Sequence, residues 1–312
     1  MKERVALVLS GGGARGNAHI GVIEELESQG FEIASVTGTS MGALVGGIYA
    51  DGALDALKEW MVSLDRRRVF NLVDFTVGKS GMVKGDKVFK AMKDFIPDTL
   101  IEDLAIPYAA VAVDLISQRE VVFRQGSLFD AMRASVSIPT VLTPVKTEKG
   151  LLVDGGVLNN IPVNHARRFD GDLLVVANVN ARIPLLLPEI SKEEDEKQKR
   201  VYMRKMEEFQ VHLQKILPRG LAEKDSKGHD EKLFLSHEGK LGYFNLISKT
   251  ISLMTHHMAQ MNLAMHNPDI LIEVSRDSCG TYDFFKAKEL VDMGRFATKK
   301  SLENYRKESR LS

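Results

Sequence analysis

The chain has 312 residues, 44% of them apolar, and its 42 Lys and Arg residues balance 42 Asp and Glu residues. This balance supplies no general attraction for nucleic acid or for an anionic membrane, so we expect no nucleic-acid partner. A single α/β domain covering residues 1–312 is ordinary at this length. The single cysteine, Cys279, excludes an intrachain disulfide, and its turn-like surroundings favour a structural role over a catalytic thiol.

The N-terminal segment lacks the marks of a secretory signal. Its apolar run covers only residues 5–9, whereas a signal peptide has an apolar stretch of about 7–15 residues followed by a small-residue cleavage site. No segment approaches the roughly 18 apolar residues that a membrane-spanning helix requires. We therefore expect a soluble, cytoplasmic protein.

The first fifty residues alternate between short apolar runs and helical patterns. Residues 5–9 end in a glycine loop, which is typical of a buried strand, and residues 18–26 follow with helical spacing until Gly30. A second short run at 33–36 reaches Gly38, and the small apolar residues 41–50 suit a helix packed on a sheet. This order predicts a mainly parallel sheet with helices on its faces.

The rest of the chain contains further apolar runs of strand length and a C-terminal helix that begins near Phe284. Runs that are almost entirely apolar suit strands that are covered on both faces. The expected strands are Tyr108 to Leu115, Glu120 to Phe123, Leu151 to Val153, Leu173 to Val179 and Ile270 to Val274.

A charged, methionine-rich region at 185–265 predicts a helical insertion within the domain. Residues 190–217 form one amphipathic pattern, a polar loop covers 222–232, and a second amphipathic pattern follows. Three uses fit the apolar stripes: burial against each other or the sheet, a homodimer interface, or a lipid-facing cap. The second stripe consists of Phe244, Ile247, Ile251, Met254, Met258, Met261 and Met265.

The pentapeptide Gly38-Thr39-Ser40-Met41-Gly42 fits the Gly-x-Ser-x-Gly pattern of a nucleophile elbow. That elbow places the serine on a sharp strand-to-helix turn, where small neighbours avoid a clash. The context agrees, because an apolar strand precedes the motif and a small-residue helix follows it. A helix N-cap is the structural alternative for Ser40.

The loop after the first strand matches the glycine pattern of dinucleotide-binding proteins in Gly11-Gly12-Gly13-Ala14-Arg15-Gly16. A nucleotide site would require an acidic residue after the second strand to hold the ribose, but Ser40 follows that strand. The remaining use is an oxyanion hole, in which backbone N–H groups stabilise a tetrahedral intermediate. Arg15 then orders the loop or adds positive potential, with a plain surface arginine as the alternative.

A third motif, Val153-Asp154-Gly155-Gly156, leaves an apolar strand. Two interpretations of Asp154 are open: it caps a turn, or it accepts a proton directly from Ser40. None of the eight histidines combines a strand end with a glycine turn, as a triad histidine would. His19 and His165 come nearest, and both fit helix positions better.

Together these motifs resemble the patatin-like phospholipase family, most closely its small bacterial members. Residues 133–139 and 157–163 also fit the family pattern, and the resemblance is strong from about residue 4 to 180. It implies a three-layer α/β/α fold and a Ser–Asp dyad that needs no metal or cofactor. By position it makes Ser40 the nucleophile and Asp154 the base, and it places residues 135–139 near them. The oxyanion site is then Gly11, Gly12, Gly13 and Arg15.

The sequence therefore predicts hydrolysis of a lipid or fatty-acyl ester through an acyl-enzyme, with transient contact to a membrane surface. Three alternatives remain open. One is an acyltransferase or thioesterase that uses the same dyad with another acceptor. The second is a non-catalytic lipid-binding regulator, and the third is a nucleotide-binding domain.

Overall fold

The computed structural model describes residues 3–72, 85–139, 142–148, 150–185 and 243–309. Contacts group Met1–Leu186 with Thr250–Ser312 as one compact unit and Leu187–Lys249 as another. The charged helix expected at 190–217 and the polar loop at 222–232 lie outside the described residues. The insertion at 185–265 within a single domain therefore stays a prediction.

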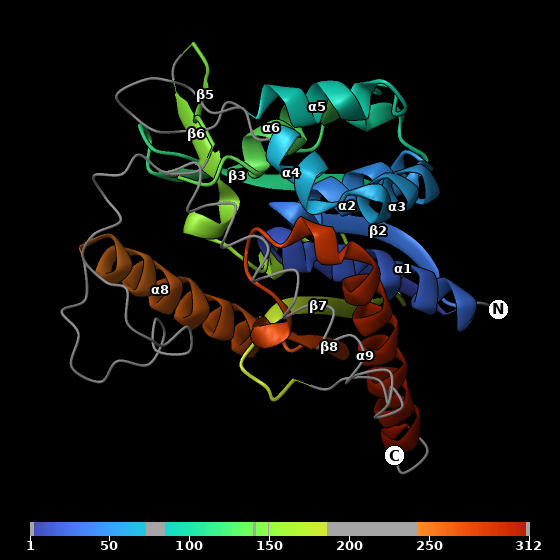
Figure 1. Cartoon of the computed structure of the whole chain (residues 1–312). Helices are drawn as coiled ribbons and strands as arrows, with labels where there is room; N and C mark the ends of the chain where they lie inside the picture. Colours follow the sequence, from blue (N-terminus) through green and yellow to red (C-terminus); the bar gives the residue numbers. More distant parts are fainter. Residues whose placement is uncertain (1–2, 73–84, 140–141, 149, 186–242, 310–312) are drawn as a thin grey trace, which may run out of the picture. The chain divides into compact units, whose positions relative to one another are not determined.

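An eight-stranded sheet forms the centre of the first unit, in the order β5-β6-β3-β2-β1-β7-β8, with β4 also pairing with β3 (Figure 1). The β1–β2, β1–β7, β2–β3 and β7–β8 pairs are parallel, whereas β3–β4, β3–β6 and β5–β6 are antiparallel. All the strands expected from the apolar runs are present. The strands are β1 (Arg4–Leu9), β2 (Glu32–Thr39), β3 (Tyr108–Asp114), β4 (Arg119–Phe123), β5 (Val145–Lys146), β6 (Leu151–Asp154), β7 (Leu173–Ala181) and β8 (Ile270–Ser275).

Helices cover both faces of this sheet, so the three-layer α/β/α fold is confirmed. Alternate strand residues point to opposite faces. Val175 and Ala177 of β7 join the large core under α1, α2 and α9, while Leu174 and Val176 meet the described part of α8. The α-helices are α1 (Ala18–Ser28), α2 (Met41–Ala50), α3 (Leu54–Ser63), α4 (Arg66–Leu72), α5 (Asp86–Lys93), α6 (Leu128–Ser135), α8 (Tyr243–His266) and α9 (Ala287–Glu308). The short 3₁₀ segments are η1 (Gly13–Asn17), η2 (Ile101–Asp103), η3 (Gly155–Val157), η4 (Val163–His165), η5 (Arg276–Ser278) and η6 (Phe284–Lys286).

The methionine stripe of α8 does not face the sheet. Within residues 250–266 the side chains of Ile251, Met254, Met261 and Met265 are all at least half exposed. Ala259 and Leu263 meet the sheet instead. Burial of this stripe against the sheet, one of the uses expected from the sequence, is therefore wrong for these residues, because a different face of the helix, with Ala259 and Leu263, packs inward.

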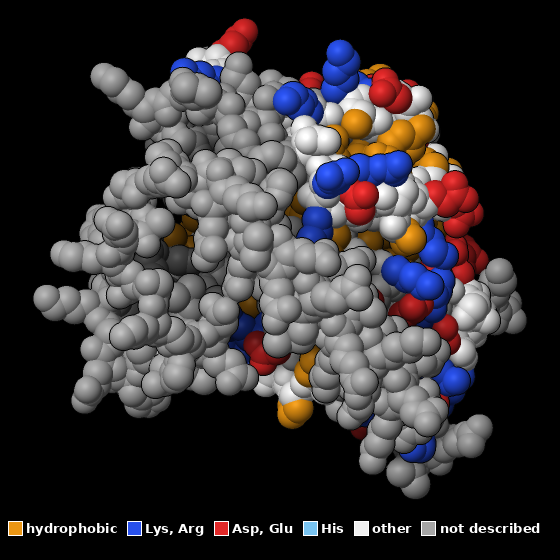
Figure 2. Space-filling model, in the orientation of Figure 1, with side chains coloured by type: hydrophobic (Ala, Val, Ile, Leu, Met, Phe, Trp, Pro, Cys, Tyr) orange, Lys and Arg blue, Asp and Glu red, His pale blue; other side chains and the backbone are white. Residues whose placement is uncertain are grey.

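The described surface mixes charges of both signs. Figure 2 shows Lys and Arg side chains interspersed with Asp and Glu on the coloured part of one face, in agreement with the balanced composition. Among the described residues, no helix is both long and apolar enough to cross a bilayer.

Helices α1 and α9 cross at a distance that only glycine permits. A Cβ atom on Gly21 would lie 1.9 Å from the Val291 carbonyl oxygen, and one on Gly294 would lie 2.0 Å from the Ala18 carbonyl oxygen. Both contacts would be with backbone, which cannot swing aside as a side chain can. This crossing holds α1 against the sheet directly after the glycine-rich loop.

We expect Gly294→Ala to destabilise the protein by roughly 2 kcal/mol, since overpacking of a tight contact costs about 1–3 kcal/mol. The effect opposes helix propensity, which favours alanine over glycine by about 1 kcal/mol. Urea unfolding measures it, with Lys299→Ala on the exposed side of α9 as the control. A Gly294→Ala protein as stable as the wild type would contradict the close approach.

Candidate active site

Ser40 lies on the sharp turn between β2 and α2 and has a backbone φ of 54° and ψ of −125°. Such a conformation costs a non-glycine residue about 1–3 kcal/mol, and the surrounding packing must enforce it. A Cβ on Gly38 would lie 2.4 Å from the Gly42 carbonyl oxygen, and one on Gly42 would lie 2.3 Å from the Leu9 carbonyl oxygen. Both glycines of the motif are therefore required by close backbone approach.

The backbone of Ser40 is held by a serine from α6. The Ser40 amide donates to the Ser135 Oγ at 2.9 Å, and the Ser135 hydroxyl donates to the Val111 carbonyl oxygen at 2.6 Å. Ser40 itself is only 3% exposed. Ser135 thus links the turn at Ser40 to β3, and sequence patterns did not reveal this contact.

Strand pairing brings Asp154 to the same place. β3 pairs with β2 through Thr39 and Val111, and with β6 through Ala112 and Asp154, so the ends of β2 and β6 meet across β3. The Asp154 amide donates to the Ser137 carbonyl oxygen at 2.9 Å. The segment 135–137 therefore contacts both motifs, so it lies near Ser40 and Asp154 as the resemblance implied.

The Asp154 carboxylate is buried, with 6% of the residue exposed. Its Oδ1 accepts from the Gly156 amide at 2.7 Å, while its Oδ2 has no partner in hydrogen-bonding geometry among the described residues. Burial raises the pKa of Asp154 to about 6, against the lowering effects of the Ser40 hydroxyl and the Gly156 amide. The Ser40 hydroxyl thus influences the pKa of this carboxylate, but no hydrogen bond between the two side chains is formed in this structure.

The glycine-rich loop lies against Ser40. A Cβ on Gly11 would lie 3.2 Å from the Ser40 Cβ. The Gly11 amide already donates to the Asn160 carbonyl oxygen at 3.0 Å. Among the described residues, the amides of Gly12 and Gly13 have no such partner, and Gly13 has the positive φ of 56° that favours glycine.

Arg15 anchors this loop to two other parts of the chain. Its Nε donates to the Asn180 Oδ1 at 3.0 Å and one terminal nitrogen donates to the Cys279 carbonyl oxygen at 3.0 Å. Asn180 also donates from its side chain to the Gly11 carbonyl oxygen. Arg15 is therefore a structural tie rather than a free surface cation.

The histidines and the cysteine considered from the sequence make contacts away from Ser40. The Nε2 of buried His19 donates to the Ser10 carbonyl oxygen at 2.8 Å, and burial lowers the pKa of His19 to about 4. The Nε2 of His165 interacts with the Glu120 Oε2 at 2.5 Å. Burial also raises the pKa of the Cys279 thiol to about 11, which disfavours a reactive thiolate. No hydrogen bond joins either of these histidines to Ser40.

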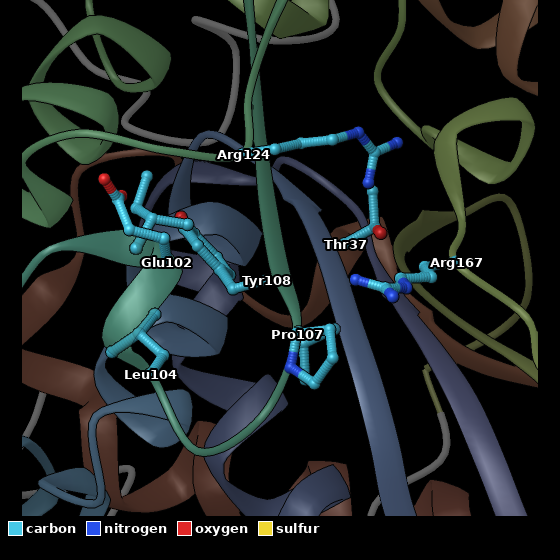
Figure 3. A pocket seen from close by; sticks show the side chains of 9 residues that line it. Thr37, Glu102, Leu104, Pro107, Tyr108, Arg124 and Arg167 are labelled. Atoms are coloured by element: carbon cyan, nitrogen blue, oxygen red, sulfur yellow. The ribbon is translucent and has the colours of Figure 1, made fainter.

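Two cavities among the described residues lie away from this site. A cavity of about 250 Å³ lies beside β2 and β3, where Arg124 and Arg167 extend toward Thr37 (Figure 3). Another of about 420 Å³ lies between β8 and α9. Neither is lined by Ser40 or Asp154, so we assign neither to the acyl chain of a substrate.

The chain is similar in sequence to known proteins. The family model for patatin-like phospholipases matches residues 7–167. An uncharacterized NTE family protein of Mycobacterium tuberculosis is 32% identical over 97% of this chain and 92% of its own length. Patatin-like phospholipase domain-containing protein 6 of Mus musculus is 34% identical over 57% of this chain and 14% of its own. The crystal structure of VipD from Legionella pneumophila aligns with a TM-score of 0.47 and 14% identity, over 97% of this chain and 67% of VipD.

The matched span contains the glycine-rich loop, the elbow at Ser40 and the aspartate motif at Asp154. It covers more than half of the chain, and the mycobacterial relative extends the similarity over nearly all of it. The chain belongs to the patatin-like phospholipase family.

Proposed function

We propose that this protein hydrolyses acyl esters of the phospholipid, lysophospholipid or simple carboxylic ester type, with Ser40 and Asp154 as a catalytic dyad. Membership of the family supports lipid acyl hydrolysis in general. The observation that carries the finer assignment is a strained serine beside a buried carboxylate whose pKa is raised. Strained backbone and perturbed titration both concentrate at functional sites.

In the first half of the reaction the Ser40 Oγ attacks the ester carbonyl carbon, and Asp154 accepts the hydroxyl proton. The carbonyl oxygen becomes an oxyanion, and we assign its stabilisation to the amides of Gly12 and Gly13, which have no hydrogen-bond partner among the described residues. Collapse of this intermediate breaks the ester bond. Asp154 returns the proton to the departing alcohol, and an acyl-Ser40 ester remains.

In the second half, water replaces the serine hydroxyl. Asp154 takes a proton from the water as it attacks the acyl-Ser40 carbonyl, and the same amides stabilise the second oxyanion. Collapse releases the fatty acid and returns the proton to Ser40. The direct transfer explains why the site needs no histidine.

Burial makes Asp154 a stronger base than an exposed aspartate. A general base works best when its pKa lies near the operating pH, and burial moves this pKa from 3.8 to about 6. Gly11 contributes space for the substrate rather than a donor, because its amide is already bonded. Arg15 acts through the loop it anchors, so we assign it a positioning role.

We expect Ser40→Ala and Asp154→Asn each to lower kcat on p-nitrophenyl esters and lysophospholipids by about 10³-fold or more, as removal of catalytic groups does in other serine hydrolases. Asp55→Asn, at an exposed position of α3, is the control and should retain activity. A folded Ser40→Ala protein with full esterase activity would refute the assignment of the nucleophile.

We expect kcat/KM to rise with pH through an apparent pKa of about 6, because only the ionised Asp154 accepts a proton. Steady-state rates on a soluble ester across the acidic range measure this. A rate that stays flat from acidic to neutral pH would show that another group is the base.

Asp154 should also lower the stability of the fold. The pKa of Asp154 is about 6 in the folded state, above the unfolded value near 3.8. Proton binding therefore stabilises the folded state, and this stabilisation is fully present below about pH 4. It is lost as the pH rises through about 6. The ionised carboxylate therefore costs up to roughly 3 kcal/mol above pH 7.

We expect Asp154→Asn to be more stable than the wild type at pH 8, and the difference to vanish at low pH. Urea unfolding at the two pH values tests this. An Asp154→Asn protein that is less stable at pH 8 would mean that the carboxylate is not held at an energetic cost.

A further inference from the structure

Asn159 is buried between the two segments that carry Ser40 and Asp154. Only 1% of the residue is exposed. Its backbone carbonyl accepts from the Thr39 hydroxyl at 2.8 Å, and Thr39 directly precedes Ser40. Its backbone amide donates to the Gly155 carbonyl oxygen at 2.8 Å, and Gly155 directly follows Asp154. One residue therefore bridges the end of β2 and the loop after β6.

The side-chain amide of Asn159 is held by three other parts of the chain. Its Nδ2 donates to the Glu120 Oε2 at 3.0 Å and to the Asn164 Oδ1 at 2.8 Å. Its Oδ1 accepts from the Asn262 Nδ2 of α8 at 2.9 Å. Both donor hydrogens and the oxygen of the amide are thus in use. The buried side chain cannot turn without leaving polar atoms unpaired, which is costly, so its orientation is fixed.

Glu120, on β4, is the charged partner of this amide. Its Oε2 also interacts with the His165 Nε2 at 2.5 Å. The bonds from His165 and Asn159 lower the pKa of Glu120, against the effect of burial. Hydrogen bonds to an ionised carboxylate are stronger than those between neutral groups. Among the described residues, neither Glu120 nor the Asn159 side chain is hydrogen-bonded to Ser40 or Asp154, so any effect on that pair is indirect.

We propose that Asn159 is a positioning residue for Ser40 and Asp154, and that Glu120 fixes the orientation of its side-chain amide. Strand β3 lies between β2 and β6, so strand pairing aligns the two reacting groups only through a third strand. The two backbone bonds of Asn159 join the ends of β2 and β6 directly. Such a tie matters because a misplacement of about 1 Å between reacting groups costs roughly a hundredfold in rate.

This inference rests on the proposed function in taking Ser40 and Asp154 as the reacting pair. The alignment of the two segments does not require turnover, so it can be measured separately.

Reversal of the hydrogen bond between Asn159 and Glu120 tests the proposal. Asn159→Asp places two carboxylates against each other, whereas Glu120→Gln still offers an oxygen to the Asn159 amide. The double variant forms the bond in the opposite direction, because the glutamine Nε2 donates to the introduced carboxylate. Asn304→Asp is the matched control, since Asn304 is exposed on α9.

We expect Asn159→Asp to lower kcat on a soluble p-nitrophenyl ester roughly a hundredfold and to change KM by less than about threefold, because alignment rather than substrate binding is lost. Glu120→Gln should keep kcat within about threefold of the wild type, and the double variant should recover to within about tenfold of it. Asn304→Asp should behave as the wild type does.

Hydrogen exchange followed by mass spectrometry measures the alignment without turnover. In Asn159→Asp the peptides that contain residues 38–42 and 154–160 should exchange roughly tenfold faster, while peptides of β8 and α9 keep their rates. A general loss of stability would instead accelerate exchange throughout the sheet. Thr39→Val is a milder second variant, because it removes only the hydroxyl that bonds to the Asn159 carbonyl. It should accelerate exchange in the same two peptides.

Full kcat in the folded Asn159→Asp protein, or a double variant no faster than Asn159→Asp, would overturn the proposal. So would unchanged exchange of both peptides in Thr39→Val. Ester turnover by the wild type together with either result would refute the positioning role and leave the hydrolase standing. Local acceleration of exchange in the variants, with no ester turned over by the wild type, would support the tie between the two segments and refute the proposed hydrolase.

Discussion

One constraint shapes the site: the Asp154 carboxylate is buried next to the strained turn that carries Ser40. Asp154 reaches this position only because β6 runs antiparallel to β3, which in turn runs parallel to β2. The glycines around Ser40 are the residues that allow three backbone segments to approach so closely. Burial disfavours the charged form of the carboxylate and raises its pKa, and this raised pKa suits the base role that we propose for Asp154.

Much of the fold was predictable because strands covered on both faces are continuous apolar runs, as in β1, β3 and β7. Ser40 and Asp154 could be singled out in the sequence for a related reason. Each follows such a strand and has glycine neighbours, so a local pattern indicates a functional turn. The short edge strand β5 and helices α3 to α6 carried weaker local patterns and were not anticipated.

Local sequence patterns did not reveal the supporting contacts, because these depend on strand order, and only the family resemblance placed residues 135–139 near Ser40. Ser135 meets Ser40 across 95 residues, and Asn180 meets Arg15 across 165. No local spacing encodes such pairs. The orientation of α8 was hidden for another reason: helical periodicity reveals an apolar stripe but not whether the stripe or the opposite face meets the sheet. In residues 250–266, Ala259 and Leu263 pack against the sheet, whereas Ile251, Met254, Met261 and Met265 stay at least half exposed.

Labelling by a fluorophosphonate reagent, followed by mass spectrometry of the peptides, tests the Ser40–Asp154 pair most directly. The reagent reports the reactivity of the serine without requiring knowledge of the natural substrate. The dyad predicts a single labelled residue, Ser40, with a rate that rises through an apparent pKa near 6 and falls sharply in Asp154→Asn. Labelling at another residue, or an undiminished rate at Ser40 in Asp154→Asn, would contradict it.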